Sequence, residues 1–69
     1  MKIKDILKKI EDTGLYIEII DTESGASYGF FRKNDSLLVY NNKLKNKNIQ
    51  KLNVQYINNK RILILYIND

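Results

Sequence analysis

The spacing of apolar residues near the start of the chain predicts a helix. One apolar stripe recurs at i, i+3, i+4 and i+7, namely Ile3, Ile6, Leu7 and Ile10, which predicts an α-helix over residues 2–12. Gly14 follows where a left-handed residue commonly caps a helix. Because an isolated helix of this length is marginal in water, we expect packing against the rest of the chain to hold it.

Period-two alternation then predicts short strands. Residues 15–21 alternate, and a turn through residues 21–25, with the composition Asp-Thr-Glu-Ser-Gly, leads to a return strand at residues 27–32. Residues 36–40, Ser-Leu-Leu-Val-Tyr, read as a third strand after the break at Asn34 and Asp35.

The second half of the chain contains an irregular stretch and a predicted hairpin. Residues 41–51 lose clear periodicity and are expected to be a loop or a frayed helical turn. Residues 52–56 alternate again, and residues 61–67 return after Asn58 and Asn59, since Asn tolerates the positive φ of a tight turn. The pattern predicts one α+β domain over residues 1–69, with an antiparallel sheet of about five strands and the N-terminal helix packed on one face.

The last predicted strand is apolar on both faces. Residues 62–67 read Ile-Leu-Ile-Leu-Tyr-Ile, yet only one long helix is available to cover the sheet. A two-residue hairpin loop sets Leu63 and Leu65 beside Val54 and Leu52, whereas a three-residue loop exchanges the two faces. Either way, one apolar face lacks a cover.

Two explanations remain for that face. In the first, Leu44 and Ile49 of the irregular stretch fold over it. In the second, a second copy of the chain or a target protein docks there, because leaving each apolar side chain exposed forgoes roughly 1.5 to 3 kcal/mol.

Composition removes several classes of chemistry. Cysteine, histidine, tryptophan and proline are absent, so thiolate and imidazole catalysis and the soft metal ligands are missing, and we expect neither an enzyme nor a bound cofactor or metal. The longest apolar run is too short for a membrane span, which needs about 20 residues. We therefore expect a cytoplasmic protein that does not enter a membrane.

The positive charge is concentrated in the C-terminal part. Residues 1–30 carry four lysines and six acids, a net charge of −2, whereas residues 31–69 carry eight basic residues and two acids, a net charge of +6. Such a field favours acidic partners, but it does not choose between nucleic acid and an acidic protein surface. The chain is rich in Ile, Lys and Asn, the bias expected of AT-rich coding DNA, and part of the lysine content can reflect that bias alone.

One segment interleaves aromatic and basic side chains. On a regular strand Tyr28 and Phe30 project on the same face with Gly29 between them, and Arg32 and Lys33 follow. The order Tyr28-Gly29-Phe30-Phe31 resembles the Gly-Phe-Gly-Phe core of cold-shock and RNA-recognition motifs, whose aromatics stack on bases. The alternative is that both aromatic side chains pack in the core.

The candidate binding residues are these aromatic and basic side chains together with the lysines of the irregular stretch: Tyr28, Phe30, Arg32, Lys33, Lys43, Lys45, Lys47 and Lys51. The lysines could neutralise phosphates in a salt-dependent way or simply be solvated. Lysine outnumbers arginine ten to two, which provides poorly for bidentate reading of bases.

The overall layout resembles small α+β proteins encoded by bacteriophages and prophages. The opening Met1-Lys2-Ile3-Lys4-Asp5-Ile6-Leu7, then Tyr16-Ile17-Glu18-Ile19 and a glycine turn, are similar to theirs, as is the ending from Lys51-Leu52-Asn53-Val54 to Ile64-Leu65-Tyr66-Ile67. Some such proteins are anti-CRISPR inhibitors, which typically act as acidic DNA mimics. The basic C-terminal part of this chain departs from that mechanism.

Three functions follow as hypotheses. The first is a non-enzymatic module of phage or mobile-element origin that binds a host or phage protein and inhibits a defence system such as CRISPR-Cas. The second is a single-stranded nucleic-acid binder that uses Tyr28, Phe30 and the lysines of residues 43–51. The third is a homodimeric structural accessory protein.

Overall fold

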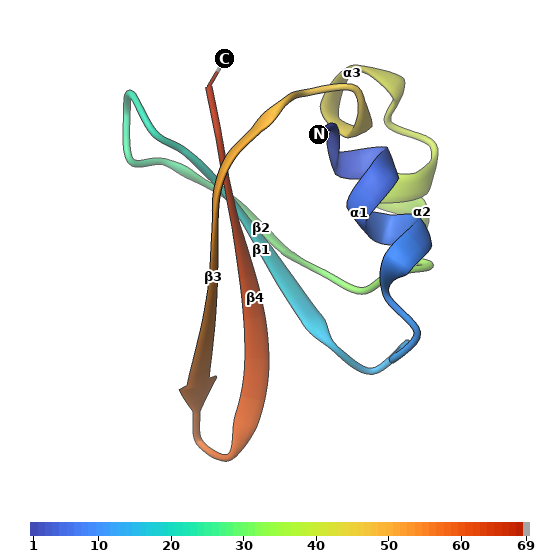
Figure 1. The fold of residues 1–69 in the computed structure, drawn as a ribbon, viewed down its shortest axis with the longest axis vertical. Helices are drawn as coiled ribbons and strands as arrows, with labels where there is room; N and C mark the ends of the chain where they lie inside the picture. The colour runs from blue at the N-terminus through green and yellow to red at the C-terminus, as the bar shows by residue number, and fades with distance from the viewer. Residues whose placement is uncertain (69) are drawn as a thin grey trace.

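The chain forms a four-stranded sheet with three short helices, and the computed structural model describes residues 1–68 (Figure 1). The elements in chain order are α1 (Ile3–Lys9), β1 (Tyr16–Asp21), β2 (Ser27–Phe31), α2 (Ser36–Val39), α3 (Asn42–Lys45), β3 (Ile49–Ile57) and β4 (Lys60–Ile67). The strand order across the sheet is β2-β1-β4-β3. The predicted α+β class is confirmed.

The sheet is mixed, which corrects the prediction of about five antiparallel strands. β1 pairs with β2, and β3 with β4, in antiparallel fashion, but β1 and β4 lie side by side in parallel, with Tyr16 beside Ile62 and Ile20 beside Tyr66. β4 is therefore a central strand. Its nearly continuous apolar sequence is typical of a strand that is buried on both faces.

The predicted third strand at residues 36–40 is wrong, because this segment is the helix α2. The carboxylate of Asp35 accepts a hydrogen bond from the backbone N–H of Leu37 at 3.0 Å and so caps the helix. Helix α3 is capped in the same way: the side-chain oxygen of Asn41 accepts a hydrogen bond from the backbone N–H of Leu44 at 3.0 Å. Residues 41–51, predicted as a loop or frayed turn, thus contain a helical turn and then the start of β3.

Helix α1 is shorter than the predicted residues 2–12. It ends at Lys9, and Ile10 already has an extended backbone with φ −80° and ψ 121°. Ending there places Lys8 and Lys9 in the last turn, where cations interact favourably with the helix dipole, and leaves Glu11 and Asp12 outside. Gly14 therefore does not cap the helix, and its N–H donates to the carboxylate of Asp12 at 2.9 Å.

The terminal hairpin is confirmed, and its register corresponds to the two-residue loop. Asn58 and Asn59 have φ values of 52° and 64°, the left-handed pair that a tight hairpin turn requires. Leu65 consequently lies opposite Leu52, and Leu63 opposite Val54.

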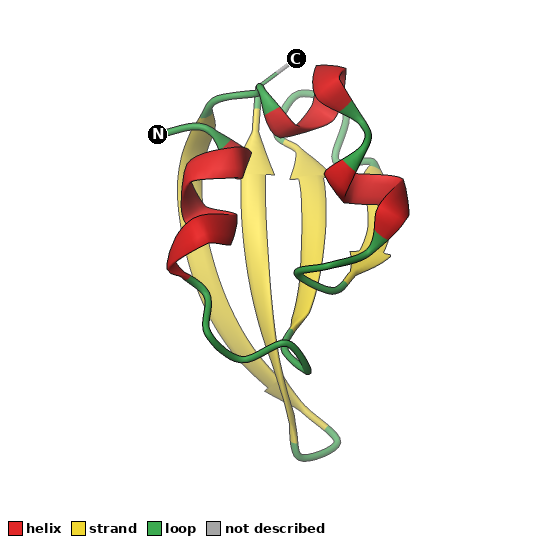
Figure 2. Cartoon of the chain, turned by 90° about the vertical axis from the view of Figure 1, so that its right-hand side faces the viewer, coloured by secondary structure: helices red, strands yellow, loops and turns green. Residues whose placement is uncertain are grey.

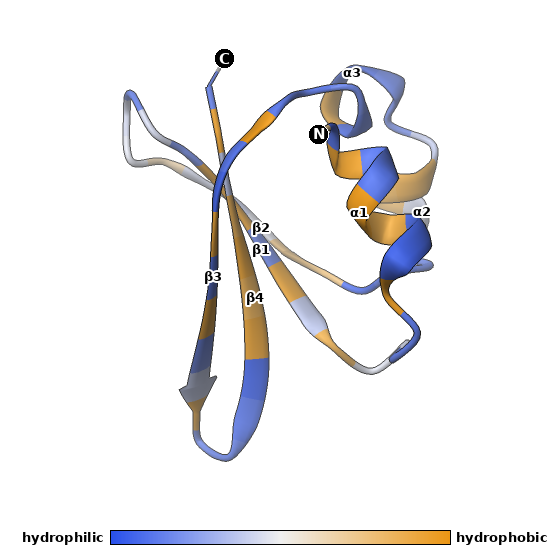
Figure 3. Ribbon diagram, in the orientation of Figure 1, coloured by the Kyte–Doolittle hydropathy of each residue, from blue (hydrophilic) through white to orange (hydrophobic). Residues whose placement is uncertain are grey.

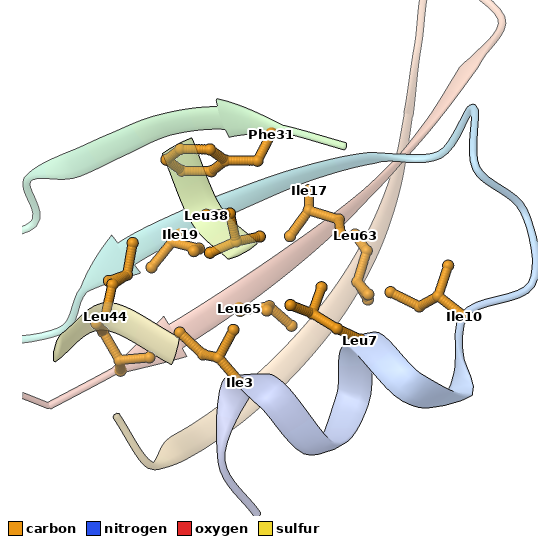
Figure 4. Packing of buried hydrophobic residues seen from close by; sticks show 11 residues of the cluster. Ile3, Leu7, Ile10, Ile17, Ile19, Phe31, Leu38, Leu44, Leu63 and Leu65 are labelled. Atoms are coloured by element: carbon orange, nitrogen blue, oxygen red, sulfur yellow. The ribbon is translucent and has the colours of Figure 1, made fainter. Parts of the chain in front are cut away.

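All three helices cover the same side of the sheet, here called the helical face (Figures 1 and 2). The core lies between this face and the helices (Figure 4). Its most deeply buried residues, each with a fully covered side chain, are Ile3, Ile17, Ile19, Leu38, Leu65 and Ile67.

The other side of the sheet, here called the open face, carries no helix within residues 1–68 (Figure 1). Leu44 and Ile49, which were one predicted cover for it, instead pack into the core on the helical face. The neighbouring strands shelter the middle of the open face. Ile62 lies between Tyr16 and Gln55 and is only 8% exposed, and Ile64 is 4% exposed.

The expectation that these apolar side chains of the last strand need a cover, from the irregular stretch or from another chain, is therefore wrong for Ile62 and Ile64. Side chains of β1 and β3 on the same face replace the missing layer. The exposed apolar surface of the open face lies at its margin, at Phe30 and Ile57, which are 57% and 47% exposed.

Candidate functional site

The two aromatic side chains that were predicted to share one face, Tyr28 and Phe30, lie on opposite faces of the sheet. Ile19 pairs with Gly29 but Ile20 pairs with Ser27, so Tyr28 is an extra residue in a β-bulge. Gly29 adopts a φ of 110°, which permits the distortion. Tyr28 consequently lines a hollow beside α3, whereas Phe30 lies on the open face opposite Glu18. The prediction that the two rings share one face is wrong.

Phe30 has a different aromatic neighbour, Tyr16 on the adjacent strand, and the two line the same hollow. The guanidinium carbon of Arg32 lies 4.7 Å from the centre of the Tyr16 ring, and the ammonium nitrogen of Lys60 lies 5.4 Å from it. Two cations thus flank one ring at distances typical of cation–π contacts. Ile57 lines the same hollow as Tyr16 and Phe30. We call this group of residues the Tyr16 cluster: Tyr16, Phe30, Arg32, Ile57 and Lys60.

A hydrogen bond fixes the arginine within this cluster. Nη2 of Arg32 donates to the phenol oxygen of Tyr16 at 2.7 Å. That hydrogen bond, followed by the charges of Arg32 and Lys60, lowers the pKa of the Tyr16 phenol below its ordinary value. The cluster is therefore electropositive around an aromatic centre.

An apolar hollow lies beside the flanked ring. Phe30 and Ile57 form its exposed apolar walls, Ile62 and Tyr16 also line it, and Lys60 lies at its rim. The walls come from opposite edges of the sheet, since Phe30 belongs to β2 and Ile57 to β3. Such a hollow can receive an apolar side chain, and the adjacent cations can bind a carboxylate.

The charge of the open face is mainly positive. Among the strand residues that the structure describes on this face, Glu18 is the only acidic one. Its carboxylate accepts a hydrogen bond from the hydroxyl of Ser27 at 2.9 Å. Lys51 extends over the Tyr66 ring at 5.7 Å on the same face. Together with Arg32 and Lys60, this lysine gives the face three cations.

The remaining predicted lysines lie elsewhere. The ammonium of Lys33 donates to the carbonyl oxygen of Ile10, at the C-terminal end of α1, and so joins the segment after β2 to that helix. Lys43 and Lys47 line the hollow that contains Tyr28, and Lys45 lines another beside α1. The structure therefore brings Phe30 and Arg32 together and separates them from Tyr28, Lys33 and the lysines of α3.

Sequence reasoning missed Tyr16, Ile57 and Lys60. Tyr16 alternates with buried residues on β1, and no motif or charge pattern in the sequence distinguishes it as a binding residue. Its proximity to Lys60 depends on the parallel pairing of β1 with β4, because Tyr16 lies beside Ile62 and Lys60 is two residues before that position. Only the order of strands in the sheet reveals the cluster.

The structure adds two observations on other classes of site. Residues 1–68 contain no group of three or more Asp, Glu, His or Cys side chains placed to hold a metal ion. None of the helices in that range has the length and apolar content needed to cross a bilayer. Comparison of the chain with protein-family models, curated proteins and solved structures finds no match.

Proposed function

We propose that this chain is a non-enzymatic protein-binding module and that the Tyr16 cluster on the open face is its binding surface. The observation that carries the proposal is the position of Phe30, an aromatic side chain 57% exposed on a helix-free sheet face, beside a tyrosine flanked by two cations. Large aromatic side chains and arginine are the residues that most often dominate the free energy of protein–protein association.

The cluster is ordered before any partner arrives. Arg32 is held by its hydrogen bond to Tyr16, and Phe30 and Ile57 project from strands. Ordering a flexible side chain at an interface costs about 0.5 to 1.5 kcal/mol, so a guanidinium already fixed in the free protein reduces that cost.

The surface fits a partner with a projecting apolar side chain and an acidic rim. The apolar side chain would fill the hollow between Phe30 and Ile57, and carboxylates would face Arg32 and Lys60. The proposed partner is a host or phage protein, and inhibition of a host defence system remains a prediction of the phage-protein resemblance.

A single-stranded nucleic acid is the less well supported ligand. Tyr28 and Phe30 lie on different faces, and the lysines of residues 43–51 line separate hollows or extend over Tyr66. A backbone-tracking site needs a continuous basic groove next to its stacking aromatics. Glu18 also places a carboxylate directly opposite Phe30.

The test is affinity capture with the tagged chain from a phage-infected bacterial lysate, comparing two site variants with one control. Phe30→Ala removes the aromatic wall and Lys60→Glu reverses one flanking charge. Tyr40→Ala removes a more exposed aromatic, 81% exposed at the end of α2 on the helical face. We expect each site variant to lose about tenfold in affinity for the captured protein, or about 1.4 kcal/mol, and the control to lose none.

Equal capture by all three variants would contradict the proposal. A salt titration with an unrelated single-stranded oligonucleotide tests the alternative. A steep fall of log affinity with log salt, abolished by the site variants, would favour nucleic acid as the ligand.

A further inference from the structure

The outer edge of β3 carries an ordered set of unpaired backbone groups. In a hairpin closed by a two-residue turn, the pair that flanks the turn is hydrogen-bonded, and such pairs then alternate along the strands. Here Ile57 and Lys60 flank the turn, so Asn53 and Gln55 direct their N–H and C=O groups toward β4. Three residues consequently direct theirs outward, away from the sheet: Leu52, Val54 and Tyr56.

The side chains of these three residues form an exposed apolar row. They lie on the helical face, opposite Leu65, Leu63 and Arg61, and are 46%, 53% and 74% exposed. The β3–β4 hairpin extends beyond the helices, which therefore leave this row uncovered (Figure 1). Apolar positions alternate with polar ones along β3 (Figure 3). The edge thus combines free hydrogen-bonding groups with apolar surface on one side.

The two edges of the sheet differ. β2 has five residues and contains the bulge at Tyr28, features that discourage pairing with another strand. β3 has nine residues, and only its beginning is covered, where the N–H of Ile49 donates to the carbonyl of Met1 at 2.8 Å. Within the described chain, no strand pairs with the outer edge of residues 51–57. Long open edges of this kind are the ones that pair with another chain.

We infer that β3 pairs antiparallel with β3 of a second copy of the chain, about a two-fold axis at Val54. In this register Val54 lies opposite the partner's Val54, and Leu52 lies opposite the partner's Tyr56. On the open face Asn53 lies opposite the partner's Gln55. Lys51 lies opposite the partner's Ile57.

The strand is complementary to itself in this register, which is why the occupant is a second copy. Aliphatic side chains meet aliphatic and aromatic ones on the helical face, and side-chain amides meet on the open face; cross-strand pairs of these kinds stabilise sheets. Lys51 faces an apolar residue, so no like charges are directly opposed. A two-fold axis uses one patch twice, as in most homodimers.

The pairing has a consequence for the open face. A two-fold axis perpendicular to the sheet joins eight strands into one sheet and keeps both open faces on the same side. The dimer would therefore present two Tyr16 clusters side by side to a partner. Two linked sites raise the effective concentration for the second binding event. The inference concerns the outer edge of β3, which shares only Ile57 with the Tyr16 cluster, and it stands without the proposed function.

Sedimentation of the pure protein over a dilution series tests the inference. The wild-type mass is expected to rise from 8.2 kDa toward twice that value with concentration. Val54→Lys and Val54→Glu should each remain monomeric, because like charges would face each other at the axis. Mixing the two variants should restore the doubled mass, since opposite charges then face each other. Tyr40→Lys adds the same charge at a site outside β3 and should associate like the wild type.

A backbone variant separates pairing at the edge from association elsewhere. Val54→Pro removes an outward N–H without removing a bond to β4, so circular dichroism should be unchanged while the mass stays at 8.2 kDa. A wild-type protein that remains monomeric throughout, or a Val54→Lys variant that still dimerises, would overturn the inference. Neither result would decide whether the Tyr16 cluster binds a partner, because the Phe30→Ala and Lys60→Glu variants test that separately.

Discussion

Arg32 and Tyr16 are joined in two ways at once, by a guanidinium 4.7 Å from the ring centre and by a 2.7 Å hydrogen bond from Nη2 to the phenol oxygen. The pair connects the end of β2 to the start of β1 on the open face. Both side chains are accessible to solvent, so the contact adds little to stability and mainly fixes the orientation of the guanidinium. That orientation is what a partner surface would meet.

The first prediction concerns the titration of Tyr16. Its phenol should ionise at a lower pH than the roughly 10 of a free tyrosine, because the Arg32 hydrogen bond and charge favour the phenolate. Because the folded-state pKa is lowered, the stabilising contribution is present above the unfolded value and is lost as pH falls through the folded one. Nuclear magnetic resonance of the Tyr16 ring during an alkaline titration measures this directly.

Arg32→Gln should raise the pKa of Tyr16. Arg61→Gln is the matched control, since that guanidinium lies 3.4 Å from the carboxylate of Asp12 and is not a cause of the Tyr16 shift. A Tyr16 that titrates identically in the wild type and in Arg32→Gln would remove Arg32 as the cause.

The second prediction compares adjacent leucines of α2. Leu38 is fully buried in the core and Leu37 is 73% exposed. Leu38→Ala should cost about 2 to 5 kcal/mol, a large part of the roughly 3 to 10 kcal/mol expected for a chain of this size. Leu37→Ala should cost less than about 0.5 kcal/mol. Urea unfolding of the two variants measures the difference, and similar losses would contradict the burial of Leu38 and the exposure of Leu37.

The same segment shows why part of the fold was not predictable. Residues 36–40 combine leucine, valine and tyrosine in a way that suits a strand, and a four-residue helix is too short to display a helical period. The deciding features are local and tertiary: the Asp35 carboxylate caps the first turn, and Leu38 packs in the hydrophobic core. By contrast, Asn58 and Asn59 both tolerate a positive φ, so the hairpin followed from the sequence. Its register did not, because the sequence allowed a two-residue or a three-residue loop, and the structure shows the two-residue one.

The third prediction concerns the Asp35 cap. Asp35→Ala removes the acceptor for the N–H of Leu37 and should destabilise the protein by about 1 kcal/mol. Asp35→Ser keeps an acceptor and should cost only a fraction of that amount. Thermal unfolding monitored by circular dichroism is sufficient to rank the two variants, and the reverse order would exclude the capping role.

The fourth prediction concerns the bulge that separates Tyr28 from Phe30. An added Cβ at Gly29 meets nothing within 4 Å, so the cost of substitution comes from its φ of 110° rather than from a clash. Gly29→Asn should destabilise the fold by about 1 to 3 kcal/mol. Gly25→Asn should be tolerated better, because its φ of 73° is close to the left-handed region that Asn adopts. Equal costs at the two glycines would show that the bulge does not depend on this backbone conformation.

The candidate site was predictable only in part. Phe30 and Arg32 stood out as neighbouring aromatic and basic residues, and both belong to the cluster. Tyr28 was misplaced because a bulge of one residue reverses the direction of a side chain, and the bulge leaves little trace in sequence beyond Gly29. Lys60 and Ile57 were out of reach, because their proximity to Tyr16 depends on which strand neighbours β1.

The most direct test of the account is site-specific photocrosslinking in phage-infected cells. A benzophenone side chain is introduced either in place of Phe30 on the open face or in place of Tyr40 on the helical face, both exposed aromatic positions. The account predicts that one protein is crosslinked in high yield from position 30 and not from position 40. Crosslinking from position 40 with none from position 30 would contradict the claim that the open face is the binding surface.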